Sequence, residues 1–91
     1  MLLRWTPSAA ADLQQINDYL RKHHPQYRHP TLRKLYEKLR TLRESPYSGR
    51  PGTVEGTREL LFLPMPYVAI YRIGKGAIEV LRIYHGARDQ P

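Results

Sequence analysis

A segment rich in glycine and proline, residues 45–57, divides the chain into two parts with different hydrophobic periodicity. Upstream, apolar residues recur every three or four positions, as in amphipathic helices. Downstream, short runs of β-branched and aromatic residues alternate with proline and glycine, as is typical of strands and turns. We interpret the segment itself as a plain connecting loop. The chain has 91 residues, enough for one domain, 1–91, so the two parts must pack on each other.

The N-terminal part begins with a short predicted strand at residues 2–5. Thr6 is a suitable N-cap and Pro7 suits the first position of a helix, so we expect a helix over residues 7–23. One apolar stripe runs along this helix, at spacings of four, three and four residues. The stripe consists of Ala9, Leu13, Ile16 and Leu20.

A second helix is expected to end before Pro46, because the residue that precedes a proline disfavours helical geometry. It can begin at Pro25 or at Pro30, and the sequence leaves both starts open. Its apolar face comprises Leu32, Leu35, Tyr36, Leu39 and Leu42. The cations Arg33, Lys34, Lys38, Arg40 and Arg43 lie largely off that face. Such a basic face is more often merely solvated, yet it is the strongest local candidate for binding an acidic partner.

Three strands are predicted in the C-terminal part, at residues 59–63, 67–73 and 77–85, with a hairpin turn at 74–76. Strands joined by such short connections must be antiparallel. The element order is therefore β-α-α-β-β-β. We predict an α+β fold in which an N-terminal helical hairpin packs on a small, mainly antiparallel sheet.

The formal net charge of +7 favours nucleic acid or an acidic protein as a partner. The chain has no cysteine, which excludes disulfides and thiolate metal sites. The longest apolar run, residues 60–65, is too short to span a bilayer, and the N-terminus lacks the apolar run of a signal peptide. We therefore expect a cytoplasmic protein without a membrane partner.

Tyr84, His85 and Arg88 are candidates for an acid/base cluster that cleaves a phosphodiester. Histidine can move a proton near neutral pH, and arginine can stabilise charge on a phosphate. The alternative is that these residues simply meet solvent where the last strand ends. This alternative is the stronger one, because neighbouring residues of a strand point to opposite faces. The other histidines, His23, His24 and His29, lack metal-binding spacing, so neither a metal site nor a cofactor is expected.

Arg58, Arg72 and Arg82 lie on the three predicted C-terminal strands. Pairing of these strands could bring the arginines together as a basic groove for phosphates or acidic side chains. Alternatively, each arginine pairs with Glu59 or Glu79 on the surface of the sheet, which is common and needs no partner. The sequence supports both interpretations about equally.

Four segments, taken in order, resemble the ParE/RelE toxins of type II toxin–antitoxin systems, and the resemblance covers nearly the whole chain. They are residues 5–13 with Ile16 and Tyr19, residues 49–60, residues 66–73 and residues 78–89. The resemblance implies a RelE/ParE-like fold. It also implies a cognate antitoxin with an acidic, partly disordered tail, and hence a toxin–antitoxin hetero-oligomer.

The resemblance is nearer to the ParE branch, whose members act on DNA gyrase and carry out no bond chemistry. In the RelE branch, basic residues on the central strands serve mRNA cleavage on the ribosome. Glu59, Leu61 and Val68 stand at those positions here, and Arg88 alone of that set is retained. The resemblance thus implies a gyrase-inhibiting toxin that is not an enzyme. Its candidate target- or antitoxin-binding residues are Arg58, Arg72, Arg82, Arg33, Lys34 and Lys38.

Two alternatives remain open. The first is a ribosome-dependent endoribonuclease, in which the C-terminal tyrosine, histidine and arginine described above would shuttle protons and clamp the phosphate. The second is a family member that has lost toxicity and only binds its antitoxin.

Overall fold

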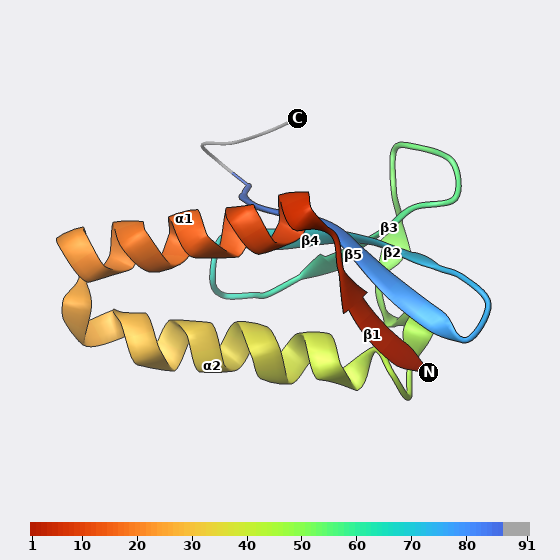
Figure 1. The fold of residues 1–91 in the computed structure, drawn as a ribbon, viewed down its shortest axis with the longest axis horizontal. Helices are drawn as coiled ribbons and strands as arrows, with labels where there is room; N and C mark the ends of the chain where they lie inside the picture. The colour runs from red at the N-terminus through yellow and green to blue at the C-terminus, as the bar shows by residue number, and fades with distance from the viewer. Residues whose placement is uncertain (87–91) are drawn as a thin grey trace.

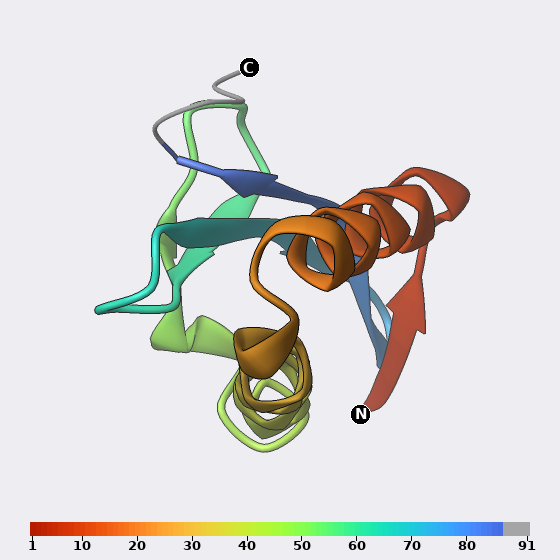
Figure 2. The same ribbon diagram turned by 90° about the vertical axis from the view of Figure 1, so that its left-hand side faces the viewer.

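A helical hairpin lies against one side of a five-stranded sheet in the computed structural model, which describes residues 1–86 (Figures 1 and 2). The expected α+β class and the order of the main elements are confirmed. The elements are β1 (Leu2–Trp5), α1 (Pro7–His23), α2 (Pro25–Thr41), a 3-10 turn (Pro46–Ser48), β2 (Arg50–Pro51), β3 (Arg58–Leu61), β4 (Tyr67–Ile73) and β5 (Ala77–His85).

Thr6 sets the start of α1 and also ties it to the last strand. Its hydroxyl oxygen accepts a hydrogen bond from the Ala9 N–H at 3.1 Å, which satisfies one of the free donors of the first turn. The same hydroxyl donates to the carbonyl of Leu81 in β5 at 2.9 Å. The helix then spans 7–23, the predicted range. This one residue therefore fixes both the helix boundary and the position of α1 beside β5.

The second helix begins at Pro25, and Pro30 lies inside it. Pro25 fits the first turn, where a backbone N–H has no helical partner, whereas Pro30 removes one interior hydrogen bond. Packing compensates for this loss, since Leu35 and Leu39 are fully buried against the rest of the molecule. The helix ends at Thr41, somewhat before Pro46. No helix within residues 1–86 is long and apolar enough to cross a membrane.

The sheet has the strand order β1-β5-β4-β3-β2 and is antiparallel except at one edge. There β1 runs parallel to β5, with Leu2 opposite Ala77 and Trp5 opposite Val80. The mainly antiparallel character is thus confirmed. A parallel pair needs a long connection, and here the first and last strands of the described chain form it.

The segment 45–57 is not a plain loop, as its composition had suggested. It contains the 3-10 turn and the two-residue strand β2, which pairs with β3 at the edge of the sheet. Tyr71 holds this segment: its hydroxyl donates to the Pro46 carbonyl at 2.6 Å and accepts from the Gly49 N–H at 3.0 Å. Pro51 suits an edge strand because an edge residue can lack a ladder donor.

The core lies between the helical hairpin and the near side of the sheet. On β4 and β5 the side chains that face the helices include Tyr71, Val80 and Ile83, all almost fully buried. A bulge interrupts the alternation: Tyr71 pairs with Val80, but Ile70 pairs with Arg82, so Leu81 is the extra residue. The bulge therefore decides which side chains of β5 point away from the helices.

Candidate functional site

Three cross-strand rows of side chains form the side of the sheet that points away from the helices, which we call the open face. Partners in a ladder share one face of a sheet, so the register alone places these residues together. The rows are Arg50, Glu59, Ile70 and Arg82; Leu61, Val68 and Tyr84; and Arg4, Glu79 and Arg72. The open face therefore combines arginines from four strands with an apolar row.

Two of these arginines are oriented by glutamates of the neighbouring strand. Nε and Nη2 of Arg50 donate to Oε1 of Glu59 at 3.1 and 2.9 Å. Nε of Arg72 donates to Oε1 of Glu79 at 2.7 Å. The side chains of Arg50 and Arg72 remain 59% and 57% exposed, while those of Glu59 and Glu79 are 10% and 33% exposed. Each guanidinium thus stands above its carboxylate with other N–H groups turned to solvent.

Arg82 is oriented by the helix rather than by the sheet. Its Nε and Nη2 donate to the two carboxylate oxygens of Asp12 at 2.7 and 3.0 Å, a bidentate pair that raises the pKa of Arg82 above its ordinary value. Asp12 also accepts the buried backbone N–H of Ile83 at 2.9 Å. Strand β1 pairs with β5 only as far as Val80. Asp12 therefore replaces a strand partner at the point where β1 ends.

The predicted grouping of Arg58, Arg72 and Arg82 is wrong for Arg58. Its ladder partner is Tyr71, so it points to the helix side, where its guanidinium donates to the carbonyls of Tyr47 and Gly49. Arg72 and Arg82 do share the open face. For Arg72 the alternative interpretation also holds, since it pairs with Glu79 as expected of a surface arginine.

Arg50 takes the place that Arg58 was expected to fill, and sequence reasoning missed it. The residue was assigned to a loop, where no face can be predicted. A signal was present, however: glycines at positions 52 and 56 permit a hairpin, and such a hairpin sets Arg50 opposite Glu59. A two-residue strand containing proline gives too little alternation for this pattern to stand out.

Tyr84 and His85 point to opposite sides of β5, as the alternation predicts. Tyr84 lies on the open face, opposite Val68, whereas His85 lies opposite Tyr67 on the helix side. The rings of His85 and Tyr67 meet edge to face at 5.7 Å between centroids. The third candidate, Arg88, lies outside the described residues. Within residues 1–86 the candidate proton-transfer groups are therefore not brought to one point.

Burial raises the pKa of Tyr84 above the ordinary 10.0, the negative charge of Glu59 raises it further, and Arg50 opposes the change. The phenol therefore stays protonated at neutral pH and is a poor proton acceptor there.

We expect alkaline titration, followed by ultraviolet absorbance, to show Tyr84 ionising above the ordinary tyrosine value of 10.0. Tyr84→Phe removes this component and so identifies it, and Glu59→Gln should lower its pKa. The pKa of Tyr84 is higher in the folded protein than in the unfolded chain. The neutral phenol therefore makes its full contribution to stability below pH 10.0, the ordinary pKa, and this contribution is lost as the pH rises through the pKa of the folded protein. A component of Tyr84 at or below the ordinary value would contradict this assignment.

The basic candidates on α2 do not belong to the open face. Lys38 is tied to β3, since its Nζ donates to the Leu61 carbonyl at 2.5 Å and lies 5.8 Å from the centre of the Phe62 ring. Arg33 and Lys34 are exposed on the helix surface. Among residues 1–86, no group of three histidine, cysteine or acidic side chains is placed to hold a metal ion.

A family model described as the ParE toxin of type II toxin–antitoxin system, parDE, matches residues 3–90. This chain belongs to the ParE toxin family. As a ParE-family protein it is the toxin component of a type II toxin–antitoxin module, and its partner is a cognate antitoxin. The resemblance that the sequence suggested is confirmed at the level of the family.

Two similar proteins of other bacteria are both named as toxins. Y4kP of Sinorhizobium fredii is 34% identical over 89 residues, which cover 98% of this chain and 92% of that protein. Toxin RelE2 of Caulobacter vibrioides is 37% identical over 84 residues, covering 92% of this chain and 93% of that one. The similarity covers more than nine-tenths of each relative and of this chain, so the family assignment applies to the whole domain.

Among solved structures, a chain of the chromosomal ParDE system from P. aeruginosa is 33% identical and superimposes with a TM-score of 0.82, covering 93% of this ParE-family chain and 95% of the other. YafQ from E. coli matches with a TM-score of 0.65 at 17% identity, covering 93% and 92% of the two chains. The second similarity shows the shared fold alone.

Proposed function

We propose that this ParE-family toxin inhibits DNA gyrase, and thereby replication, by binding through its open face and without cleaving RNA. One observation carries the proposal. Glu59, Leu61 and Val68, which stand where the resemblance to the RelE branch would require basic residues, lie together on the open face. An acid and two aliphatic side chains there offer no positive charge to a scissile phosphate.

The surroundings of these three residues support the same proposal. Arg50, Arg72 and Arg82 each already pair with a carboxylate, so their net field is weaker than that of free cations. Tyr84 is neutral at physiological pH, and His85 points to the other side of the sheet. A surface of this kind is suited to recognising a protein, with an apolar row flanked by oriented guanidinium donors.

The experiment is a supercoiling assay with purified toxin, gyrase, ATP and relaxed plasmid. We expect the toxin to inhibit supercoiling and to cause cleaved DNA to accumulate. Arg72→Ala should weaken the inhibition by about tenfold or more, because it removes a central guanidinium of the binding surface. Arg21→Ala is the matched control. It removes an arginine of similar exposure (65%, against 57% for Arg72) that pairs with Asp18 on α1, and the variant should act like the unmodified toxin.

The second candidate function is ribosome-dependent mRNA cleavage, which the name of the Caulobacter relative favours. Two results together would favour this function over gyrase inhibition. Gyrase would remain active at toxin concentrations that stop growth, and mRNA would be cleaved on ribosomes. In that case Tyr84→Phe, His85→Ala or Arg88→Ala should abolish toxicity. Gyrase and the ribosome are both cytoplasmic, so either target places the toxin in the cytoplasm. If cells continue to grow when the protein is induced, antitoxin binding is the only function that remains of those considered.

A further inference from the structure

The turn that joins α1 to α2 projects beyond the sheet at one end of the long axis of the molecule (Figures 1 and 2). We call residues 19–29 the hairpin tip. Every residue from 21 to 27 is exposed, and residues 21–30 include no valine, leucine, isoleucine or methionine. The tip is therefore a projecting, polar end of the molecule.

The charge of the tip has one sign. From residue 19 to residue 36 the chain has no acidic side chain, but it has five arginine or lysine residues and three histidines. The cations of the tip itself are Arg21, Lys22 and Arg28. Arg21 pairs with Asp18 at 2.9 Å, whereas no ion pair within residues 1–86 involves Lys22 or Arg28. These two residues therefore supply most of the positive field of the tip.

Helix stability accounts for only part of this charge. Cations are favourable at the C-terminal end of a helix and unfavourable at its N-terminal end, because the peptide dipoles are aligned. Arg21 and Lys22 lie in the last turn of α1, where their charge stabilises the helix. Arg28 is the fourth residue of α2, and the first turn of α2 has no acidic residue. The charge at the start of α2 thus opposes the helix dipole, which indicates a role outside the fold.

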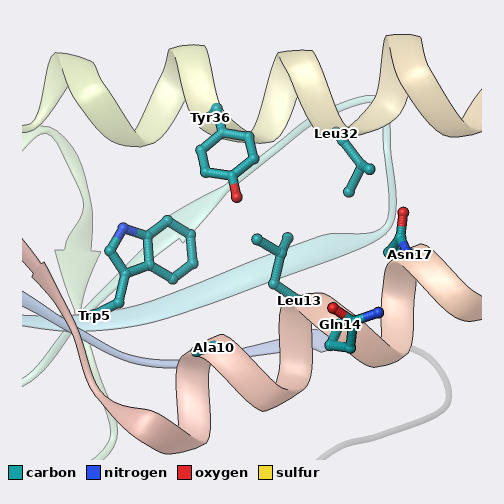
Figure 3. Close-up of a pocket in the computed structure, with 7 residues that line it drawn as sticks. All are labelled: Trp5, Ala10, Leu13, Gln14, Asn17, Leu32 and Tyr36. Atoms are coloured by element: carbon teal, nitrogen blue, oxygen red, sulfur yellow. The ribbon is translucent and has the colours of Figure 1, made fainter.

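Arg28 is oriented by a residue of the other helix. Its Nη1 donates to Oδ1 of Asn17 at 3.1 Å. Figure 3 shows Asn17 at one end of the hollow between the helices, pointing from α1 toward α2. A guanidinium has five N–H groups, and this contact uses one, so the others can donate to phosphate oxygens. Because Asn17 is neutral, it orients Arg28 without cancelling its charge.

Four exposed rings follow one another across the tip. Tyr19 lies 4.6 Å from His23 and 6.2 Å from His24, measured between ring centroids. His24 in turn lies 6.3 Å from Tyr27. Tyr19 is 37% exposed and Tyr27 is 58% exposed. Unpaired bases stack on such rings whatever their sequence, while neighbouring cations hold the backbone of the strand.

We propose that the hairpin tip binds a single strand of DNA, with phosphates at Lys22 and Arg28 and an unstacked base on Tyr27. The combination of cations with exposed rings carries this inference, because cations alone would suit any polyanion. The choice of DNA rather than RNA rests on the proposed function, since gyrase acts on DNA. Such a contact would favour cleaved over intact DNA, because a break exposes strand ends.

Other partners fit the tip less well. A duplex keeps the faces of its bases within the stack, so the rings would add nothing to its binding. A bilayer surface requires apolar side chains that insert into it, and residues 21–30 contain no leucine, isoleucine or valine for this purpose. The centre of a protein interface is likewise largely apolar, so an acidic protein would find only charges here.

The test follows the fluorescence anisotropy of a labelled DNA strand of roughly ten nucleotides, a common length for a single-strand site, as the full toxin is added. We expect Tyr27→Ala to weaken binding about tenfold, the effect of losing one stacking contact. Tyr47→Ala is the matched control, because Tyr47 is also exposed (71% against 58%) but lies in the 3-10 turn after the other end of α2. Its affinity should be unchanged.

The same titration at several salt concentrations tests the charge. Lys22→Ala should weaken binding about threefold and reduce the slope of log affinity against log salt by about 0.7, the value for one phosphate contact of a single strand. Lys75→Ala removes the same charge from the exposed β4–β5 turn and should leave the slope unchanged. All four variants change exposed residues, so the fold should persist.

Three results would each overturn the proposal. The first is a Tyr27→Ala variant that binds the strand as the unmodified toxin does. The second is an equal loss of affinity for a duplex of the same sequence, since stacking would then not be involved. The third is tighter binding of polyglutamate, or of RNA of the same sequence, than of the DNA strand.

Failure of this inference can be told apart from failure of the gyrase proposal, because the titration contains no gyrase. A toxin that binds the strand through Tyr27 but leaves supercoiling intact would refute gyrase inhibition alone. A toxin that inhibits gyrase, but whose Tyr27→Ala variant binds the strand normally, would refute the role of the hairpin tip alone.

Discussion

Asp12→Ala is expected to lower the free energy of unfolding by about 2–3 kcal/mol, a large part of the stability of a small domain. The carboxylate accepts the buried N–H of Ile83 and two hydrogen bonds from Arg82, and alanine leaves that N–H without its partner. Arg82 adds less to the cost, because its guanidinium is half exposed and water can solvate it. Thermal unfolding should show a decrease in melting temperature of roughly 10–20 °C.

Asp18→Ala on the same helix is the control for this prediction. Asp18 also pairs with an arginine, Arg21, but its side chain is 50% exposed and contacts only exposed partners. Its replacement should change stability by less than about 0.5 kcal/mol. Equal losses for the two variants would mean that Asp12 is merely a surface charge and does not hold α1 to the edge of β5.

Gly49→Ala is expected to cost about 3 kcal/mol, because the new methyl group has no room. Its Cβ would lie 2.6 Å from the Tyr71 hydroxyl and 2.7 Å from the backbone carbonyl of Glu59. Tyr71 is fully buried and cannot move aside, so the hydrogen bonds that hold the 3-10 turn would be disrupted as well. Urea denaturation should show a lower midpoint.

Gly74→Ala provides the comparison, since a Cβ there meets its nearest atom, the Ala77 carbonyl oxygen, at an ordinary 3.5 Å. Reduced freedom of the unfolded chain should make this variant neutral or more stable by up to about 1 kcal/mol. If Gly49→Ala behaved in the same way, the contact between Tyr71 and the turn would not be the constraint that we describe.

The helices could be predicted well because their signals are local. Thr6 and Pro7 define the start of α1, and the spacing of Leu13, Ile16 and Leu20 defines its inner side. The start of α2 could not be settled in this way. Pro25 and Pro30 are both acceptable as a first residue, and only tertiary packing of the leucines decides that Pro30 lies inside the helix.

The open face was harder to predict because it depends on contacts between distant residues. A bulge of one residue at Leu81 changes the side to which the end of β5 points. The partner of Arg82, Asp12, is 70 positions away. Arg50 could be placed on this face only by recognising β2, a strand of two residues. The opposite orientations of Tyr84 and His85 could be predicted from the sequence, because side chains alternate between the two faces along a single strand.

The parallel pairing of β1 with β5 has a consequence for the order in which the molecule is completed. A chain is synthesised from its N-terminus, so β1 is made first, yet its partner residues 77–80 are among the last of the domain. The Thr6 hydroxyl likewise waits for a carbonyl 75 residues farther along. Contacts of such high sequence separation form slowly. The topology therefore leaves β1 without its strand partner until residues 77–80 have been made.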